Sequence, residues 1–315
     1  MTWELFRGDG EPHDVDWPDP PPWRRFPVVD ADGGEPTFQA TPELVQAVNA
    51  ALHLRRPLLL TGSPGSGKSS VADAIAHELR LGPVLRWHVT STSTLDQAVY
   101  RYDALGRLQH TQRDGADDEP ARYFRLGPLG TALVASTPER PRVLLVDELD
   151  KGELDLPGDL LNVLERGEYD IDELARIDEE RVEVRGVESD PAETFEIRRG
   201  RIRCAAFPVV VMTSNGEREF PGPFLRRCVR FRLGVPDRDQ LAGIVAAHLG
   251  SEVAEETAEL IEAFAERLRA QGASRPRHAV DQLLSTVFLV TGDGAPPEAE
   301  REQLIRLVQR ALDQT

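Results

Sequence analysis

The apolar positions divide the chain into a part where strands alternate with helices and a part with helical spacing alone. Up to about residue 236, apolar runs of strand length alternate with stretches in which apolar residues recur every three or four positions. We expect strands at 57–61, 84–90, 142–148, 207–215 and 229–233. Beyond residue 236 only the helical spacing remains, and it predicts helices at 238–249, 253–270, 277–290 and 297–312. The pattern predicts a doubly wound α/β core followed by an all-helical domain.

Helices between the expected strands are indicated by their ends as well as by their spacing. Thr94 and Gln97 form a capping-box pattern at the start of a helix expected over 94–108. Further helices are expected from Thr41 onward and over 70–81, 127–135 and 156–167. The strand expected at 142–148 is apolar throughout, which is typical of a parallel strand covered on both faces.

One stretch near the end of the core predicts a β-hairpin. In FEIRRGRIRC, residues 195–204, a turn at Arg199 and Gly200 would place Ile197 opposite Ile202, so that one side is apolar. The acidic stretch from 171 to 190 shows no pattern that we assign. The N-terminal residues are rich in Pro, Asp and Trp and show no period, which predicts an extended arm.

These patterns predict three parts. The Pro/Trp-rich arm comprises residues 1–36, the α/β core residues 37–236, and a helical lid domain residues 237–315. We expect Trp17, Trp23 and Phe26 to dock the arm on the core.

Composition narrows the classes of function. The chain has 54 acidic and 37 basic residues and a formal net charge of −17, which argues against a nucleic-acid surface. No apolar run is long enough to span a membrane, and two cysteines make no disulfide framework, so we expect a cytoplasmic protein. Only two of the basic residues are lysines, Lys68 and Lys151, and the others are arginines. In a chain with so few lysines, a lysine indicates a position that needs a compact ammonium group.

A phosphate-binding loop is the strongest motif. The run GSPGSGKS fits G-x-x-x-x-G-K-[ST], with a strand before it and a helix after it. Its glycines let successive N–H groups face a phosphate, and the following helix adds a favourable dipole. Lys68 is expected to reach the β- and γ-phosphates of ATP, and the Ser69 hydroxyl to bind Mg²⁺; the alternative is a plain glycine-rich turn. The expected nucleotide-binding residues are Gly62, Ser63, Pro64, Gly65, Ser66, Gly67, Lys68, Ser69 and Ser70.

Two acids follow the strand VLLVD at the edge where an open α/β sheet binds its ligand. Asp147 suits the Mg²⁺ shell, because hard cations prefer oxygen ligands. Glu148 points elsewhere and could polarise the attacking water. The alternative is a pair of solvated acids, which is how we interpret the nearby Asp150, Glu153 and Asp155.

Two further positions extend the candidate site. Asn215 ends the strand VVVMTSN, where an amide could position water or sense the γ-phosphate; the alternative is an ordinary Asn-Gly turn. Arg226 and Arg227 lie in a short helical turn before the last strand. A charged guanidinium on an exposed turn could reach the γ-phosphate of a neighbouring subunit, and surface salt bridging is the alternative.

These residues resemble the MoxR-like branch of the AAA+ ATPases over about 37–290. The resemblance is carried by GSPGSGKS, LGPLGTAL, VLLVDE with the DELDK turn, VVVMTSN and FPGPFLRRC. It implies a P-loop NTPase fold with a helical lid, the sensor-1 asparagine at Asn215 and the arginine finger at Arg227, with Arg226 as the alternative. It also implies a sensor-2 arginine within GASRPR, at Arg277 or else Arg275.

The resemblance further implies a hexameric ring that hydrolyses ATP with Mg²⁺ at subunit interfaces and remodels a protein client, often with a separate von Willebrand factor A-type partner. Three other functions remain open. One is a small-molecule kinase, another is a nucleic-acid-linked motor or defence component, and the last is a nucleotide switch that does not hydrolyse.

Overall fold

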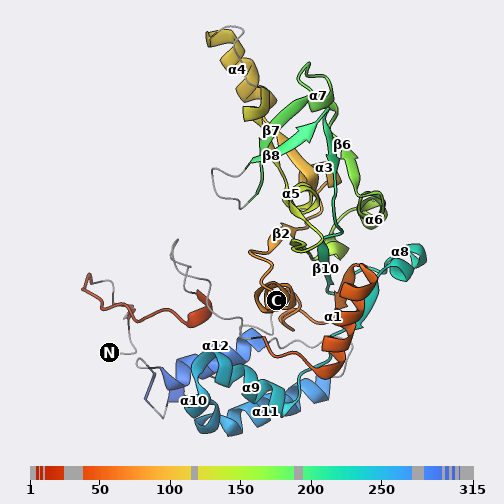
Figure 1. Cartoon of the computed structure of the whole chain (residues 1–315). Helices are drawn as coiled ribbons and strands as arrows, with labels where there is room; N and C mark the ends of the chain where they lie inside the picture. The colour runs from red at the N-terminus through yellow and green to blue at the C-terminus, as the bar shows by residue number, and fades with distance from the viewer. Residues whose placement is uncertain are drawn as a thin grey trace. The chain divides into compact units, whose positions relative to one another are not determined.

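The computed structural model describes residues 5–6, 8–9, 11–24, 38–114, 120–187, 194–271, 280–292, 295–297, 300–301 and 305 (Figure 1). The chain divides into two compact units. The larger unit comprises 40–62 and 68–233, and the smaller comprises 1–39, 63–67 and 234–315. Within the described residues, no helix has both the length and the apolar character needed to cross a bilayer.

The main sheet of the larger unit has five strands, all parallel, in the order β11-β1-β10-β5-β2. The strands are β1 (Leu58–Thr61), β2 (Leu85–His88), β5 (Val143–Asp147), β10 (Val209–Ser214) and β11 (Val229–Arg232). All five expected strands are present, each slightly shorter than expected, and the α/β prediction is confirmed. The chain order does not reveal that β10 lies between β1 and β5.

Helices of the larger unit begin and end near the expected residues. They include α1 (Pro42–Leu54), α2 (Ser70–Glu78), α5 (Pro128–Ala135), α6 (Leu156–Arg166) and α8 (Gly222–Arg227). Thr41 caps α1, because its hydroxyl accepts the Leu44 N–H at 3.3 Å. The helix α6 ends at Gly167, whose positive φ of 63° is the conformation that glycine adopts at low cost.

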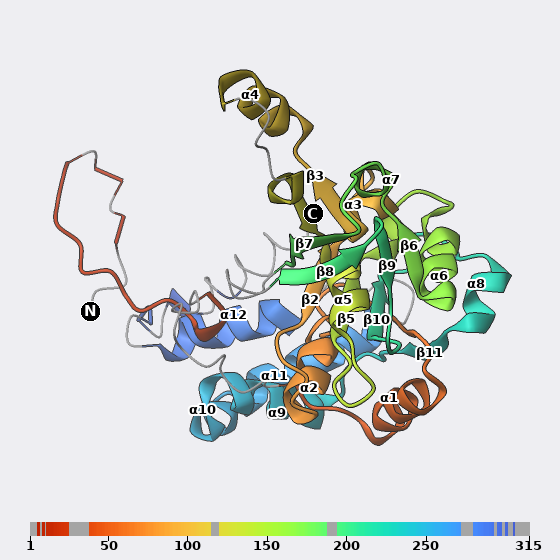
Figure 2. The ribbon, with the colours of Figure 1, turned by 45° about the horizontal axis from the view of Figure 1, so that its top comes forward.

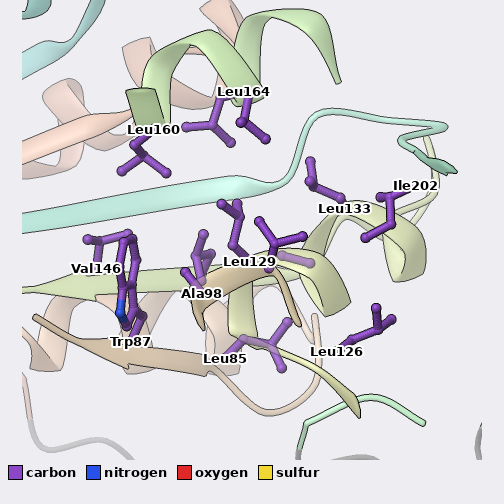
Figure 3. Packing of buried hydrophobic residues seen from close by; sticks show 14 of the residues in the cluster. Leu85, Trp87, Ala98, Leu126, Leu129, Leu133, Val146, Leu160, Leu164 and Ile202 are labelled. Atoms are coloured by element: carbon purple, nitrogen blue, oxygen red, sulfur yellow. The ribbon is translucent and has the colours of Figure 1, made fainter. Parts of the chain in front are cut away.

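The core of the larger unit forms where these helices cover the sheet. In Figure 3, Trp87 of β2 lies beside Val146 of β5, and Leu160 and Leu164 of α6 point toward the same cluster. Fully burying a side chain of this size stabilises the fold by about 1.5–3 kcal/mol. The cluster therefore fixes α6 against the sheet that carries the candidate site.

Glycines explain how α5 approaches its neighbour α3 (Leu95–Val99) so closely. A Cβ on Gly127 or Gly130 would collide with the carbonyl oxygens of Ala98 and Val99 respectively. Only glycine fits at both positions without displacing backbone. The two glycines of LGPLGTAL are therefore required for the packing of α5 against α3.

A second, six-stranded sheet has the order β3-β4-β7-β8-β9-β6 (Figure 2). Its strands are β3 (Tyr100–Tyr102), β4 (Phe124–Leu126), β6 (Glu168–Asp170), β7 (Arg181–Arg185), β8 (Thr194–Arg198) and β9 (Arg201–Arg203). The expected hairpin is confirmed: Arg198 pairs with Arg201, and Arg199 and Gly200 form the turn with positive φ values of 50° and 70°. Ile197 and Ile202 are both buried, as expected.

The acidic stretch that had no assignment belongs to this second sheet. It contains α7 (Asp172–Ala175) and β7, and β7 pairs antiparallel with β8. Val182 and Val184 of β7 are buried, while the residues alternating with them are exposed. The strand is half-buried, and its valines alternate with charged residues in the period of two that such a strand requires.

The single helix expected over 94–108 is wrong. The capping box of Thr94 and Gln97 is present, but the chain leaves α3 after Val99, forms β3 and then α4 (Ala104–Asp114). β3 pairs antiparallel with β4, and the Tyr102 ring stacks on Phe124 with centroids 4.4 Å apart. This pairing with a distant strand overrides the local helical pattern.

The larger unit also contains the short helices η2 (Pro120–Tyr123) and η3 (Leu149–Lys151).

The smaller unit contains the expected helices in modified form. They are α9 (Arg238–Leu249), α10 (Ser251–Glu256), α11 (Ala258–Gln271) and α12 (Val280–Thr291), and α9 packs against the other three. The single helix expected over 253–270 is interrupted at Thr257, whose hydroxyl donates to the Val253 carbonyl at 2.7 Å. Most of 297–312 lies outside the described residues.

Among the described residues of the N-terminal arm, Trp23 packs against helices of the smaller unit and not against the α/β core on which we expected it to dock. Trp23, in η1 (Pro22–Arg24), lies edge-on to Phe288 and His248, with ring centroids 5.9 and 6.3 Å away. Trp17 is 80% exposed, contrary to the docking role expected for it. Phe26 lies outside the described residues.

Candidate nucleotide-binding and catalytic site

The carboxyl ends of four parallel strands form the edge on which the candidate site is built. Thr61 ends β1 opposite Ser214 of β10, and Asp147 of β5 lies opposite His88 of β2. The strand β10, which is followed by Asn215, lies between β1 and β5. β1 leads into the phosphate loop, and β5 ends in Asp147. The polar residues predicted from distant parts of the sequence therefore end at one edge.

The glycine pattern of the phosphate loop matches its backbone. The loop follows β1 directly, and Gly65 and Gly67 have positive φ values of 71° and 79°. L-residues with a side chain rarely adopt this conformation, so the glycines are required by the turn. Ser69 is the N-cap residue of α2, and its hydroxyl makes no capping hydrogen bond. That hydroxyl is therefore used elsewhere.

Lys68 is a buried cation surrounded by acids. The residue is 7% exposed, and Nζ donates to the Gly62 carbonyl at 3.0 Å. Burial lowers the pKa of Lys68, while the charges of Asp147, Asp150 and Glu148 oppose that shift. A desolvated ammonium in this position is suited to binding an anion, such as a phosphate group, at the loop.

The two predicted metal ligands lie side by side. Ser69 Oγ donates to Asp147 Oδ1 at 2.7 Å, and Thr213 Oγ1 donates to the same oxygen at 2.7 Å. Hydroxyl and carboxylate oxygens are the donors that Mg²⁺ prefers, and it typically takes only one or two from protein beside substrate phosphates. The donor set therefore fits a magnesium ion that Ser69 and Asp147 would hold.

Glu148 is oriented by its neighbours on several sides. Its backbone has a positive φ of 58°, which is uncommon for a residue with a side chain, and its N–H donates to Thr213 Oγ1 at 2.8 Å. Oε1 accepts the Asn215 amide at 3.2 Å, and Oε2 lies 2.7 Å from Lys151 Nζ. The predicted base and the predicted sensor are thus in direct contact.

Sequence reasoning did not place His88 in the site. Its Nε2 lies 3.4 Å from Glu148 Oε2, and its Nδ1 lies 3.7 Å from Asp147 Oδ2. The signal available in the sequence was that an expected strand, 84–90, ends in polar residues, as the strands before Asp147 and Asn215 do. Parallel strands end at the same edge, so His88 could have been included.

The expectation that Asp150 is solvated is wrong. The residue is 3% exposed, and Oδ2 accepts the backbone N–H groups of Asn215 and Glu217, each at 3.0 Å. Arg218 donates to the carbonyl oxygens of Asp150 and Gly152. A buried carboxylate requires hydrogen-bond donors, and here the donors come from the segment after β10. The bonds therefore join the turn after β5 to that segment. The fourth position of DELDK is therefore structural.

The candidate arginine finger lies on α8, away from Glu148 in sequence. Arg227 forms an ion pair with Glu165 of α6 at 2.6 Å, and both side chains are 49% exposed. Arg226 is also exposed. The structure brings neither arginine to the strand ends within the described part of the chain, so a role for Arg227 stays a prediction. Arg275 and Arg277, the alternatives for sensor 2, lie outside the described residues.

The parallel order, the glycine loop ahead of α2 and the acids at the strand ends define a P-loop NTPase core of the AAA+ type with a helical C-terminal region. Residues 57–221, just over half of the chain, match a family model described as AAA domain (dynein-related subfamily). The chain belongs to this family.

Among solved structures, a mutant of RuvB from Thermotoga maritima aligns with 85% of this chain and 74% of its own, at 15% sequence identity and a TM-score of 0.35. No curated protein sequence matches the chain.

Proposed function

We propose that this protein is a MoxR-like AAA+ ATPase that hydrolyses ATP at the subunit interfaces of a ring. The observation that supports hydrolysis most directly is the pair of contacts at the strand ends: Ser69 on Asp147, and Asn215 on Glu148. A site that only bound nucleotide would not need a carboxylate oriented beside the metal ligand. The resemblance in DELDK, VVVMTSN and FPGPFLRRC supports the finer, MoxR-like assignment.

In this proposal Lys68 and the loop glycines bind the phosphates of ATP. A bound Mg²⁺, held by Ser69 and Asp147, would supply positive charge to the phosphate oxygens. Glu148 accepts a proton from water as the water oxygen forms a bond to the γ-phosphorus. The bond to the bridging oxygen breaks, and its electron pair leaves with ADP. Asn215 holds the Glu148 carboxylate during this step.

The remaining residues act between subunits or from the lid. Arg227 of one subunit is proposed to reach the γ-phosphate bound by its neighbour, with Arg226 as the alternative; its half-exposed position on α8 is consistent with such a contact. Sensor 2 is Arg277 or Arg275. We retain an arm over 1–36, a core over 37–236 and a lid over 237–315, a cytoplasmic location, and a separate protein client or von Willebrand factor A-type partner for a hexameric ring.

The first experiment separates nucleotide binding from hydrolysis. Glu148→Gln keeps the shape of the side chain but loses its ability to accept a proton, so ATP turnover should fall by about 10²–10⁴-fold. ATP affinity should stay within about twofold, because Lys68 and the loop are unchanged. Release of phosphate and the affinity of a fluorescent ATP analogue are measured on the full chain. Asp147→Asn should instead raise the Mg²⁺ concentration needed for turnover.

The same assay separates the alternatives. A phosphorylated small molecule accumulating in place of free phosphate would favour a kinase, and stimulation by DNA with a steep salt dependence would favour a nucleic-acid motor. Parental turnover in Glu148→Gln would remove Glu148 from the mechanism. Absence of turnover in the parental ring, with normal ATP affinity, would favour a nucleotide switch.

A further inference from the structure

The proposed base has an unusual partner three residues along the chain. Lys151 Nζ lies 2.7 Å from Glu148 Oε2, and the side chains are 40% and 24% exposed. The hydrogen bond to Glu148 raises the pKa of Lys151, so the ammonium is charged at neutral pH. An exposed ion pair of this spacing is worth little for stability, about 0.2–1 kcal/mol. Its place at the candidate catalytic carboxylate gives it another use.

The composition of the chain supports a specific use for this cation. Lys68 and Lys151 are the only two lysines among 37 basic residues, and every other one is arginine. Lys68 belongs to the phosphate loop. The second lysine contacts the carboxylate that we assign to proton transfer, so both lysines of the chain lie at the candidate site.

The contacts of the carboxylate are unequal at its two oxygens. Oε2 is bonded to Lys151 and also lies 3.4 Å from His88 Nε2, whereas Oε1 accepts Asn215 Nδ2 at 3.2 Å. A carboxylate oxygen has two acceptor sites. Among the described residues, Oε2 therefore has a charge-assisted bond to Lys151 and His88 Nε2 beside its second acceptor site, whereas Oε1 accepts one neutral amide and keeps its second acceptor site.

We propose that Lys151 is a positioning residue for ATP hydrolysis. Its ammonium holds Oε2, fixes the plane of the Glu148 carboxylate, and leaves Oε1 as the oxygen that accepts the proton of water. Asn215 completes the arrangement from the neighbouring strand. This inference rests on the proposed function, since it requires that Glu148 act on water.

The test is a comparison of two substitutions at one position. Lys151→Met keeps the length of the side chain but removes the charge, so the carboxylate loses its hold and kcat should fall about 10- to 100-fold. The KM for ATP and the affinity for a fluorescent ATP analogue should stay within about twofold, because nothing that binds the phosphates has changed. Lys151→Arg retains a cation that can bond Oε2 and should keep at least about a third of the parental kcat.

Matched controls distinguish this role from a structural one. Arg238→Met removes an ion pair of the same 2.7 Å length, to Glu262 on the helices of the smaller unit, and should leave kcat unchanged. Thermal unfolding of all variants should agree within the small effect of a surface ion pair. A loss of kcat that Lys151→Arg does not restore, or that accompanies a large drop in melting temperature, would overturn the proposal.

Two further outcomes are decisive. A parental or increased kcat in Lys151→Met would also overturn the proposal, an increase meaning that the ion pair restrains Glu148. The Glu148→Gln variant, assayed in parallel, separates this failure from that of the proposed function. If Glu148→Gln is inactive while Lys151→Met is fully active, only the positioning role is wrong. If Glu148→Gln is active, the base assignment itself is wrong.

Discussion

Lys68 is the residue at which burial and charge act most directly on nucleotide binding. Its ammonium is nearly buried, bonded to the Gly62 carbonyl and close to three carboxylates. Lys68→Ala should abolish stabilisation by Mg·ATP, which for the parent amounts to about 2.7 kcal/mol at a hundredfold excess over Kd. Thermal unfolding with and without nucleotide measures this difference. The ligand-free variant should melt as the parent does, and an unchanged response to ATP would contradict the assignment.

At the scale of elements, the tip of the β8–β9 hairpin depends on a glycine. Gly200 has a positive φ of 70°, and a Cβ there would collide with the Ala175 backbone nitrogen and lie 2.7 Å from the Ile171 carbonyl oxygen. Gly200→Ala should therefore lower the free energy of unfolding by about 2–5 kcal/mol, through strain and overpacking together. Urea denaturation followed by circular dichroism measures the change.

A matched glycine separates the two causes. Gly216 has a similar φ of 77°, but a Cβ there would meet nothing within 4 Å. Gly216→Ala should cost only the backbone strain, about 1–2 kcal/mol. Equal losses at the two positions would mean that the close contact between the hairpin and α7 contributes nothing.

At the scale of the whole molecule, Arg227 must break its ion pair with Glu165 of its own chain before it can reach a neighbouring subunit. The pair of Arg227 with Glu165 is half-exposed and worth about 0.2–1 kcal/mol, which a ring contact can readily replace. In a ring of heterologous interfaces, Arg227→Ala has an intact pocket and Glu148→Gln an intact finger. Mixed at equal ratio, these inactive variants should regain about a quarter of parental turnover, the share of interfaces that pair two intact halves.

Size measurements on the mixture must show mixed oligomers for this test to count. Arg226→Ala is the matched control, and it should be active alone if Arg227 is the finger. Mixed rings that form and stay inactive would exclude a finger in trans at Arg227. Recovery with Arg226→Ala, together with an active Arg227→Ala, would assign the finger to the neighbouring arginine instead.

The sequence by itself determined the features that depend on neighbouring residues. The glycine loop, the five apolar strands and the turn at Arg199 and Gly200 were predicted because backbone conformation and side-chain alternation are local properties. The position of Asp147 and Glu148 at the end of a buried strand was predicted for the same reason. The roles of these residues in catalysis stay predictions.

Tertiary structure decided what distant segments do to one another. Pairing of β3 with β4 replaced the helix expected over 94–108, and insertion of β10 between β1 and β5 placed Asn215 on Glu148. Burial turned Asp150 from an expected surface acid into a bridge between two loops. These three features depend on contacts between residues that are distant in the sequence. A local pattern does not contain the energies of such contacts, because burial and strand pairing depend on which surfaces meet when the chain folds.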